Sequence, residues 1–201
     1  MALQREFSDI DIYLFDQLLK GRIGPRDRVL DAGCGSGRNL TYLLRLGVDV
    51  SAVDRNAHAI AEVRELAARL APHLPADQFR VEAIDALSFP DDAFTVVISS
   101  AVLHFAADDD AFDRMVDAMW RTIVPGGMLF ARLATTIGIE SRVRPLGHGR
   151  FALPDGSERY LVDERRLMDC TARLNGQLLD PLKTTLVQDQ RAMTTWVVRK
   201  R

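Results

Sequence analysis

Short apolar runs alternate with longer amphipathic segments along most of the chain, from residue 28 to residue 133. The runs have the continuous apolar character of buried strands, and the segments between them repeat apolar side chains at helical spacing. This alternation predicts a parallel sheet with helices on both faces. The expected strands are residues 28–32, 49–53, 79–83, 94–98 and 128–133. The expected helices are residues 57–70 and 108–123, and a segment that carries Leu40, Leu43 and Leu44 and stops at Gly47.

Both ends of the chain depart from this alternation. A helix with Ser8 or Asp9 as its cap is expected at residues 8–20. Near the other end, residues 162–174 have helical spacing, and two strands rich in Leu, Val and Thr are expected at residues 177–186 and 192–199. The link between these two strands is short enough for an antiparallel hairpin.

The composition is that of one ordinary globular domain. The chain has 201 residues, 47% of them hydrophobic and 27% charged, with a formal net charge of −2. Disordered chains are less hydrophobic, and general nucleic-acid-binding domains usually have a basic excess that this chain lacks. Two cysteines, Cys34 and Cys170, are too few for a disulfide framework or a cysteine-rich zinc site. With no apolar run long enough for a membrane span and charges where a signal peptide needs an apolar core, a cytoplasmic protein is expected.

The most informative stretch is Asp31-Ala32-Gly33-Cys34-Gly35-Ser36-Gly37, which follows the first expected strand. Alternating glycines let a backbone approach a ligand closely, and the carboxyl edge of an open α/β sheet is where such folds bind ligands. A phosphate-binding P-loop would need a lysine after the glycines, and none follows. A dinucleotide-binding loop, Gly-x-Gly-x-x-Gly, would need glycine where Arg38 stands, and no Tyr-x-x-x-Lys pair of a short-chain dehydrogenase is present. A nicotinamide-dependent enzyme is therefore the weaker interpretation.

Three further motifs follow the glycine loop in order. An acidic residue, Asp54, ends the second expected strand, and another, Asp85, follows the third. A turn is expected at Pro125-Gly126-Gly127, before the fifth strand. Together with Asp31 and its glycines, these motifs resemble those of the class I S-adenosylmethionine-dependent methyltransferases, strongly over residues 28–134 and loosely elsewhere.

The resemblance implies a fold and a division of the chain. The fold would be a Rossmann-like, doubly wound, mostly parallel seven-stranded α/β sheet with an antiparallel C-terminal hairpin strand. Residues 1–201 would form a single domain, with an N-terminal helical cap at residues 1–27 and a substrate-covering insertion after strand five at residues 135–160.

The resemblance also implies a site for S-adenosylmethionine, which becomes S-adenosylhomocysteine after transfer. Asp54 would accept hydrogen bonds from both ribose hydroxyls, because a carboxylate forms strong charge-assisted bonds. The glycine loop would pass beside the methionyl part, Asp85 would accept from the adenine amino group, and the Ala86 backbone N–H would donate to the ring. The full expected set is Asp31, Gly33, Cys34, Gly35, Gly37, Asp54, Arg55, Asp85, Ala86 and Ser100. Structural alternatives remain open: Asp31 could cap the loop, Asp85 could cap a turn, and Cys34 could be a small buried side chain.

Methyl transfer from a sulfonium depends mainly on alignment of the reacting groups, so a general base is needed only for some acceptors. His104 is the candidate base because imidazole titrates near neutral pH; the alternative is a histidine that shapes the pocket wall. The Asn/Asp-Pro-Pro-Tyr motif of enzymes that methylate amino nitrogens is absent after strand four. Acidic metal ligands are also absent at the ends of strands four and five, so no metal is expected. The acidic cluster at residues 108–110 is interpreted as a helix start.

The segment from residue 135 to residue 155 has no clear period. Its Arg142, Arg144, His148 and Arg150 could attract an anionic acceptor, or could belong to a polar surface loop. The predicted function is methyl transfer to a small molecule, without membrane or nucleic-acid partners. The alternatives are a non-catalytic S-adenosylmethionine-binding partner protein, a nicotinamide oxidoreductase, and a methyltransferase acting on RNA or protein.

Overall fold

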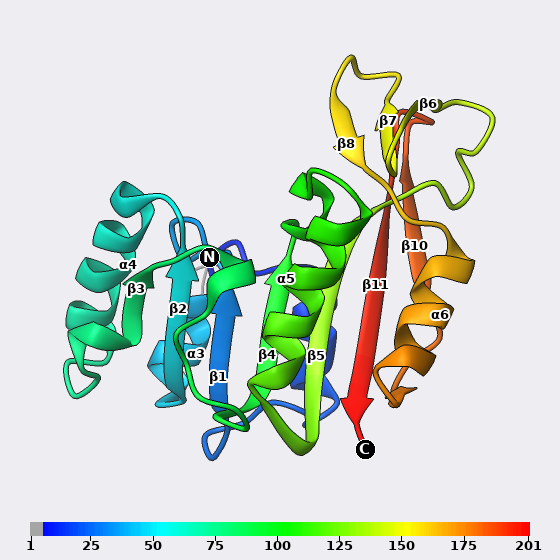
Figure 1. The fold of residues 1–201 in the computed structure, drawn as a ribbon. Coiled ribbons are helices and arrows are strands. Elements are labelled where there is room, and N and C mark those ends of the chain that lie inside the picture. Colours follow the sequence, from blue (N-terminus) through cyan, green and yellow to red (C-terminus); the bar gives the residue numbers. More distant parts are fainter. Residues whose placement is uncertain (1–5) are drawn as a thin grey trace.

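A computed structural model describes residues 6–201. Its main sheet has eight strands, in the order β10-β11-β5-β4-β1-β2-β3, with β9 paired to β11 (Figure 1). The parallel strands are β1 (Arg28–Ala32), β2 (Asp49–Asp54), β3 (Phe79–Val81), β4 (Phe94–Ser100) and β5 (Ile123–Thr135). The antiparallel strands are β9 (Gly176–Leu178), β10 (Lys183–Val187) and β11 (Arg191–Lys200). The expected doubly wound parallel sheet with a C-terminal hairpin is confirmed.

Helices cover both faces of this sheet. In Figure 1, α5 (Asp109–Arg121) and α6 (Glu164–Arg173) lie in front of it, and α2 (Ile12–Leu19) and α3 (Leu40–Leu46) lie behind. Helix α4 (Ala57–Leu70) packs in the same hydrophobic cluster as α2 and α3. Three short 3₁₀ turns complete the set: η1 (Ala76–Gln78), η2 (Ile84–Ala86) and η3 (Leu103–Phe105). Successive strand side chains point to opposite faces, and β1, β2, β4, β5 and β11 contribute to a hydrophobic cluster on each face.

The predicted strand at residues 177–186 is divided in two, which is why the sheet has eight strands and not seven. Residues 179–182 contain Pro181, which has no backbone N–H to donate to a ladder. On either side of this break, β9 pairs with the end of β11 and β10 pairs with its beginning, with Leu178 opposite Val198 and Lys183 opposite Thr195. The hairpin between β10 and β11 forms as expected.

Two helix caps show how the sequence sets the helix starts. The cap of α2 is Asp11, whose carboxylate accepts the Tyr13 N–H at 2.9 Å, so the prediction of Ser8 or Asp9 as the cap was wrong. Asp108 caps α5 by accepting the Ala111 N–H at 2.7 Å, which confirms the acidic cluster as a helix start.

Pro125-Gly126-Gly127 was expected to be a turn before strand five, but it lies inside β5. The strand begins at Ile123 opposite Phe94, and the register then shifts so that Val96 faces Met128. A side chain at Gly127 would place its Cβ 2.8 Å from the Thr95 carbonyl oxygen, so only glycine lets β4 and β5 approach here. The extra residues form a bulge in the ladder instead of ending it.

The expected insertion at residues 135–160 contains a second sheet. Its strands β6 (Arg144–Gly147), β7 (Arg150–Ala152) and β8 (Glu158–Tyr160) pair antiparallel, and they stand above the ends of β5 and β11 in Figure 1. A small apolar cluster of Leu153, Leu161 and Ala134 joins this insertion to the main sheet. The insertion is therefore a packed element beside the carboxyl edge of β4 and β5.

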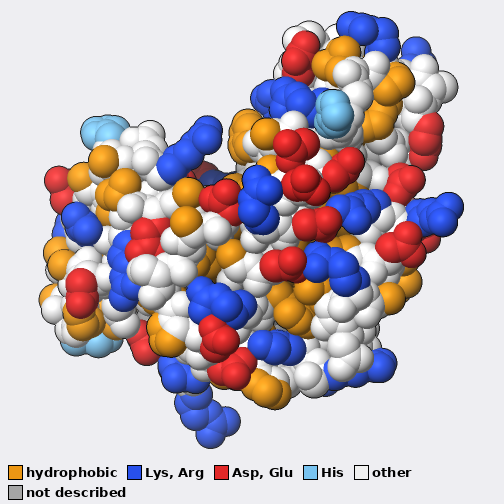
Figure 2. All heavy atoms as spheres, in the orientation of Figure 1, with side chains coloured by type: hydrophobic (Ala, Val, Ile, Leu, Met, Phe, Trp, Pro, Cys, Tyr) orange, Lys and Arg blue, Asp and Glu red, His pale blue; other side chains and the backbone are white. Residues whose placement is uncertain are grey.

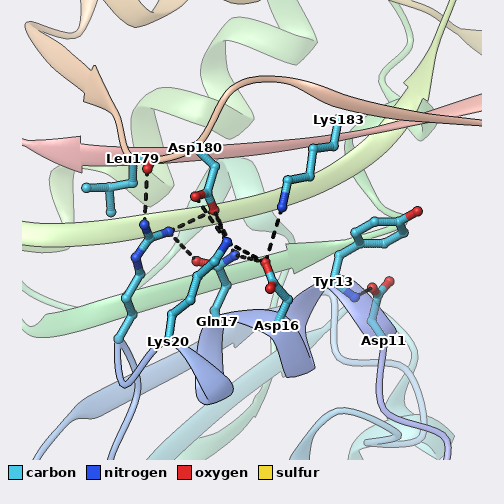
Figure 3. A network of polar contacts seen from close by, with 9 residues as sticks. Asp11, Tyr13, Asp16, Gln17, Lys20, Leu179, Asp180 and Lys183 are labelled. Atoms are coloured by element: carbon cyan, nitrogen blue, oxygen red, sulfur yellow. Dashed lines mark hydrogen bonds and ion pairs between the residues drawn. The ribbon is translucent and has the colours of Figure 1, made fainter.

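Polar contacts fasten α2 to the segment between β9 and β10 (Figure 3). Asp180 accepts hydrogen bonds from Gln17 Nε2 at 3.0 Å, Lys20 Nζ at 3.1 Å and Arg22 NH1 at 2.8 Å. Burial alone would raise the pKa of Asp180, but these donors outweigh it and lower the pKa to about 2. The described part of the N-terminal cap is thus held against the sheet by charge-assisted bonds. Residues 1–5 of that expected cap lie outside the described residues.

Candidate active site

The glycine loop lies at the carboxyl end of β1, between β2 and β4. The Gly33 and Cys34 N–H groups donate to the Val53 carbonyl of β2 at 2.8 and 3.0 Å, which bends the chain across the sheet edge. Gly33 has φ +84°, and a Cβ there would lie 2.5 Å from Val102 Cγ2. Gly35 has φ +51°, and a Cβ there would meet nothing within 4 Å. The loop is packed against protein at Gly33 and faces open space at Gly35, as a ligand cradle requires.

Asp54, at the end of β2, is bound to the glycine loop. Its Oδ2 accepts the Gly35 N–H at 3.0 Å and its Oδ1 accepts the Asn56 N–H at 2.8 Å. These two bonds fix the carboxylate at the sheet edge. Each carboxylate oxygen has more than one acceptor site, so both oxygens keep capacity for hydroxyl donors.

Asp31 is the most unusual carboxyl group in the structure. It is fully buried, and neither of its oxygens has a hydrogen-bond partner among residues 6–201. Burial raises the pKa of Asp31 to about 7; the guanidinium of Arg38 opposes this shift and the carboxylate of Asp54 adds to it. A buried carboxyl without donors is costly unless a ligand supplies them, so Asp31 indicates a site for a cationic or donor-rich group.

Asp85 and Ala86 lie in η2, after β3, and both are exposed. The Ala86 N–H donates to the Ala83 carbonyl at 3.1 Å. For the Ala86 N–H to donate to an adenine ring, as expected, its hydrogen bond to the Ala83 carbonyl would have to break. The roles of Asp85 and Ala86 stay predictions.

Ser100, at the end of β4, takes part in a charged cluster around the buried Asp11 carboxylate. Its hydroxyl donates to Asp11 Oδ2 at 3.0 Å and accepts from Arg38 NH2 at 3.0 Å. Arg38 and Arg132 lie 3.6 and 3.5 Å from the same Asp11 oxygen, and the Asp11 N–H donates to Asn39 Oδ1 at 3.0 Å. The start of α2 is thereby joined to the glycine loop and to β5, a link that the sequence did not indicate.

Cys34 and Arg55 differ in their surroundings. The Cys34 side chain is buried among apolar residues, and burial, aided by the charges of Asp31 and Asp54, raises the pKa of its thiol. It fits the interpretation as a small packing side chain. Arg55 is exposed, with no polar contact among residues 6–201, so its cofactor role stays a prediction.

His104 lies in η3 and is buried. Its Nδ1 accepts the Ala134 N–H at 3.3 Å, which places the ring proton on Nε2. Burial first, and then the charges of Arg159, Arg132 and Arg191, lower the pKa of His104 to about 4. The ring is therefore neutral at pH 7 and offers an N–H donor.

A cavity of about 300 Å³ opens beside His104. It is lined by Ala101, which follows β4, by Arg132 and Ala134 of β5, by the insertion, and by the hairpin of β10 and β11. Figure 2 shows the molecule hollowed along its upper edge, between the side that carries α4 and the projecting insertion. The carboxyl edge thus offers two neighbouring spaces, one at the glycine loop and one beneath the insertion.

The arginines at this cavity are not the ones that the sequence singled out in the insertion. Arg142 pairs with Asp189 at 3.7 Å and Arg150 with Glu158 at 3.7 Å. Arg144 and His148 are exposed and do not line the cavity. The cavity is lined instead by Arg132, Arg159 and Arg191. A signal existed for Arg132, since it is a lone charge within an apolar strand, but none existed for Arg159 or Arg191.

Comparisons with known proteins agree on one family. A model described as a methyltransferase domain matches residues 29–127. The ubiquinone biosynthesis O-methyltransferase of Methylocella silvestris is 35% identical over 118 residues, which cover 57% of this chain and 44% of that protein. The EEF1A lysine methyltransferase 4 of Mus musculus is 28% identical over 155 residues, covering 70% of this chain and 58% of that one. The chain spans about half the length of the curated relatives that it matches.

A solved structure shows the same fold. The 1,6-didemethyltoxoflavin-N1-methyltransferase of Burkholderia thailandensis, with bound 1,6-didemethyltoxoflavin and S-adenosylhomocysteine, superposes with a TM-score of 0.70 at 20% identity. The match covers 93% of this chain and 75% of that chain. The glycine loop, the two carboxylates beside it and these matches define a cofactor-binding Rossmann-like enzyme fold. The chain belongs to the class I S-adenosylmethionine-dependent methyltransferases.

Proposed function

We propose that this protein transfers a methyl group from S-adenosylmethionine to a small-molecule acceptor. The observation that carries the proposal is the pair of partnerless, fully buried Asp31 oxygens beside a glycine loop whose far side is open at Gly35. A positively charged ligand satisfies such a carboxyl group. The other carboxylate at the loop, Asp54, is fixed where hydroxyl donors can reach it.

The residues present fit the cofactor of this family. Asp31 would accept from the cationic part, the loop from Gly33 to Gly37 would lie along the methionyl chain, and Asp54 would bind the ribose hydroxyls. When bound, S-adenosylmethionine supplies a methyl group on a sulfonium that leaves as a neutral thioether. The protein's own contribution is to orient the acceptor, and alignment is a large part of what such a reaction needs.

Two features support a small molecule as the acceptor. The cavity of about 300 Å³ is at the lower end of the usual size for small-ligand pockets. The insertion covers it from above, and His104 offers an N–H donor at its wall. The similar proteins named above include one named for ubiquinone biosynthesis and one named for a lysine of EEF1A, so the acceptor has to be tested directly.

The proposed setting is the cytoplasm, without a membrane partner. Both cysteines, Cys34 and Cys170, are free and buried, which suits a reducing compartment. Across residues 6–201, no helix combines the length and the hydropathy needed to cross a bilayer.

Calorimetric titration with S-adenosylmethionine and with NAD tests the cofactor site. S-adenosylmethionine is expected to bind and NAD is not. Asp54→Ala should weaken the S-adenosylmethionine affinity at least about tenfold, because strong charge-assisted bonds to the ribose are lost. Asp77→Ala removes an exposed carboxylate outside the glycine loop and should leave the affinity unchanged.

Three results would contradict parts of the proposal. Binding of NAD without binding of S-adenosylmethionine would indicate an oxidoreductase. Unchanged affinity in Asp54→Ala would refute the ribose assignment. Cofactor binding without transfer of labelled methyl to any member of a broad small-molecule panel would indicate a binding protein or a macromolecular acceptor.

A further inference from the structure

The cavity beneath the insertion is strongly cationic. Arg132 of β5, Arg159 of β8 and Arg191 of β11 reach its wall from three separate elements. One acidic side chain, Asp155, is also at the wall. At neutral pH the wall therefore has an excess of two positive charges, in a protein whose formal net charge is −2.

Two of these guanidinium groups have no acidic partner in the described chain. Within residues 6–201, no carboxylate lies within 4 Å of Arg159 or Arg191. The Arg159 NH1 group donates to the backbone carbonyl of Glu158 at 2.8 Å, and its guanidinium carbon lies 5.2 Å from the centroid of the Phe105 ring. Asp155, the acid at the wall, accepts instead from the Ser157 N–H and hydroxyl at 2.9 and 2.6 Å.

The nitrogen atoms of the Arg132 guanidinium differ in their surroundings. Its NH1 atom lies 3.5 Å from Asp11 Oδ2, toward the glycine loop, while its Nε is buried without a partner. All three arginines line the same cavity as His104. A buried donor without a partner and two guanidinium groups with no carboxylate within 4 Å are features that an anion would satisfy.

Apart from His104 and Ser157, the rest of the wall is apolar. Leu153 of the insertion joins Val187 and Met193 of the hairpin, and Ala101 and Ala134 complete the surface at the sheet edge. A ligand that fills this space needs both an anionic group for the arginines and an apolar body for the side chains around them.

We infer that the acceptor is an organic acid, and that Arg159 and Arg191 bind its carboxylate while Leu153, Val187 and Met193 contact its apolar body. This inference rests on the proposed function, because it names the acceptor class of that same site. Arg132 lies between this carboxylate site and the glycine loop, and so completes the carboxylate site on the side nearest the cofactor.

Binding of matched acids and amides tests the inference without knowledge of the acceptor. Benzoate, phenylacetate and hexanoate are titrated into protein saturated with S-adenosylhomocysteine, alongside benzamide, phenylacetamide and hexanamide. Each acid should bind about tenfold or more tightly than its amide, since the amide has the same shape and lacks the charge. The double variant Arg159→Gln/Arg191→Gln should lose this preference. Arg144→Gln, which changes an exposed arginine of β6 outside the cavity, should keep it.

The outcomes separate this inference from the proposed function. Equal binding of acids and amides, no binding of either, or a preference retained in the double variant overturns the inference. In that case normal S-adenosylhomocysteine binding leaves the proposed function standing. Binding of acids by a protein that binds neither S-adenosylmethionine nor S-adenosylhomocysteine supports the anion site and refutes the proposed function. If the double variant unfolds at the same temperature as the wild type, its loss of preference for acids comes from the removed guanidinium groups and not from a destabilised fold.

Discussion

The Asp11 carboxylate lies 3.5 Å from the Arg132 guanidinium, and this contact joins the N-terminal helix to the centre of the sheet. Asp11 caps α2 and is 3% exposed, and Arg132 lies in β5. The same carboxylate contacts Arg38 of the glycine loop and Ser100 of β4. One side chain thus connects the helical cap, the cofactor loop and the cavity.

Asp11→Asn is expected to destabilise the protein by about 2 to 4 kcal/mol, because the mostly buried Arg132 guanidinium loses the carboxylate opposite it. The variant should also weaken S-adenosylmethionine binding, since Arg38 and Ser100 lose the group that fixes them. Urea unfolding and calorimetric titration measure the two effects. Asp9→Asn, an exposed neighbour on the same segment, serves as the control. Equal stability of the two variants would show that the buried cluster is not a stabilising link.

The local parts of the site could be predicted from the sequence. The glycine loop, Asp54 and the order of strands and helices depend on contacts between near neighbours along the chain, so their pattern is visible in a short window. The helix start at Asp108 was predictable for the same reason, because a cap bonds its own first turn.

The cationic cavity could not be predicted, because its arginines meet only through the tertiary fold. Arg159 comes from a sheet whose short, irregular strands have no clear period, and Arg191 comes from the first residue of β11. The cap at Asp11 was missed because Ser8 and Asp9 are equally good cap residues in sequence. The tertiary bonds to Asn39, Arg38 and Ser100 favour Asp11 instead.

Asp31 should release a proton when S-adenosylmethionine binds. Its pKa of about 7 in the free protein means that it is mostly protonated at pH 6, and a neighbouring cation favours the ionised form. Close to one proton should therefore leave at pH 6, and the release should disappear above about pH 8, where Asp31 is already ionised. Calorimetry in buffers of different ionisation enthalpy measures the number of protons.

The pH dependence is itself the control for this experiment. A binding enthalpy that is the same in every buffer at pH 6 would contradict the role given to Asp31. A release that persists unchanged to pH 9 would assign the proton to another group.

His104 should act as a hydrogen-bond donor and not as a base. With a pKa of about 4 and its Nδ1 occupied by the Ala134 N–H, the ring is neutral at pH 7 and carries its proton on Nε2. His104→Gln keeps an N–H donor and should retain more activity than His104→Ala, whose kcat/KM should fall by about tenfold or more. A base would make the two variants equally poor.

Asp180→Asn should reduce stability at neutral pH and lose this effect in acid. The donors from Gln17, Lys20 and Arg22 hold the pKa of Asp180 at about 2, below the ordinary value of 3.8 for an aspartate. A carboxyl group whose pKa is lowered on folding contributes stability above its unfolded pKa and loses it as the pH falls toward the folded value. The contribution at pH 7 is about 2 kcal/mol, and it should shrink between pH 4 and pH 2. Urea unfolding of the wild type and the variant at pH 7 and pH 3 measures the difference.

The control is Asp169→Asn, which removes an exposed carboxylate paired with Arg165 at 3.6 Å and should change stability by less than about 1 kcal/mol. A deficit in Asp180→Asn that stays constant down to pH 2 would show that the ionised form of Asp180 does not hold α2 to the sheet.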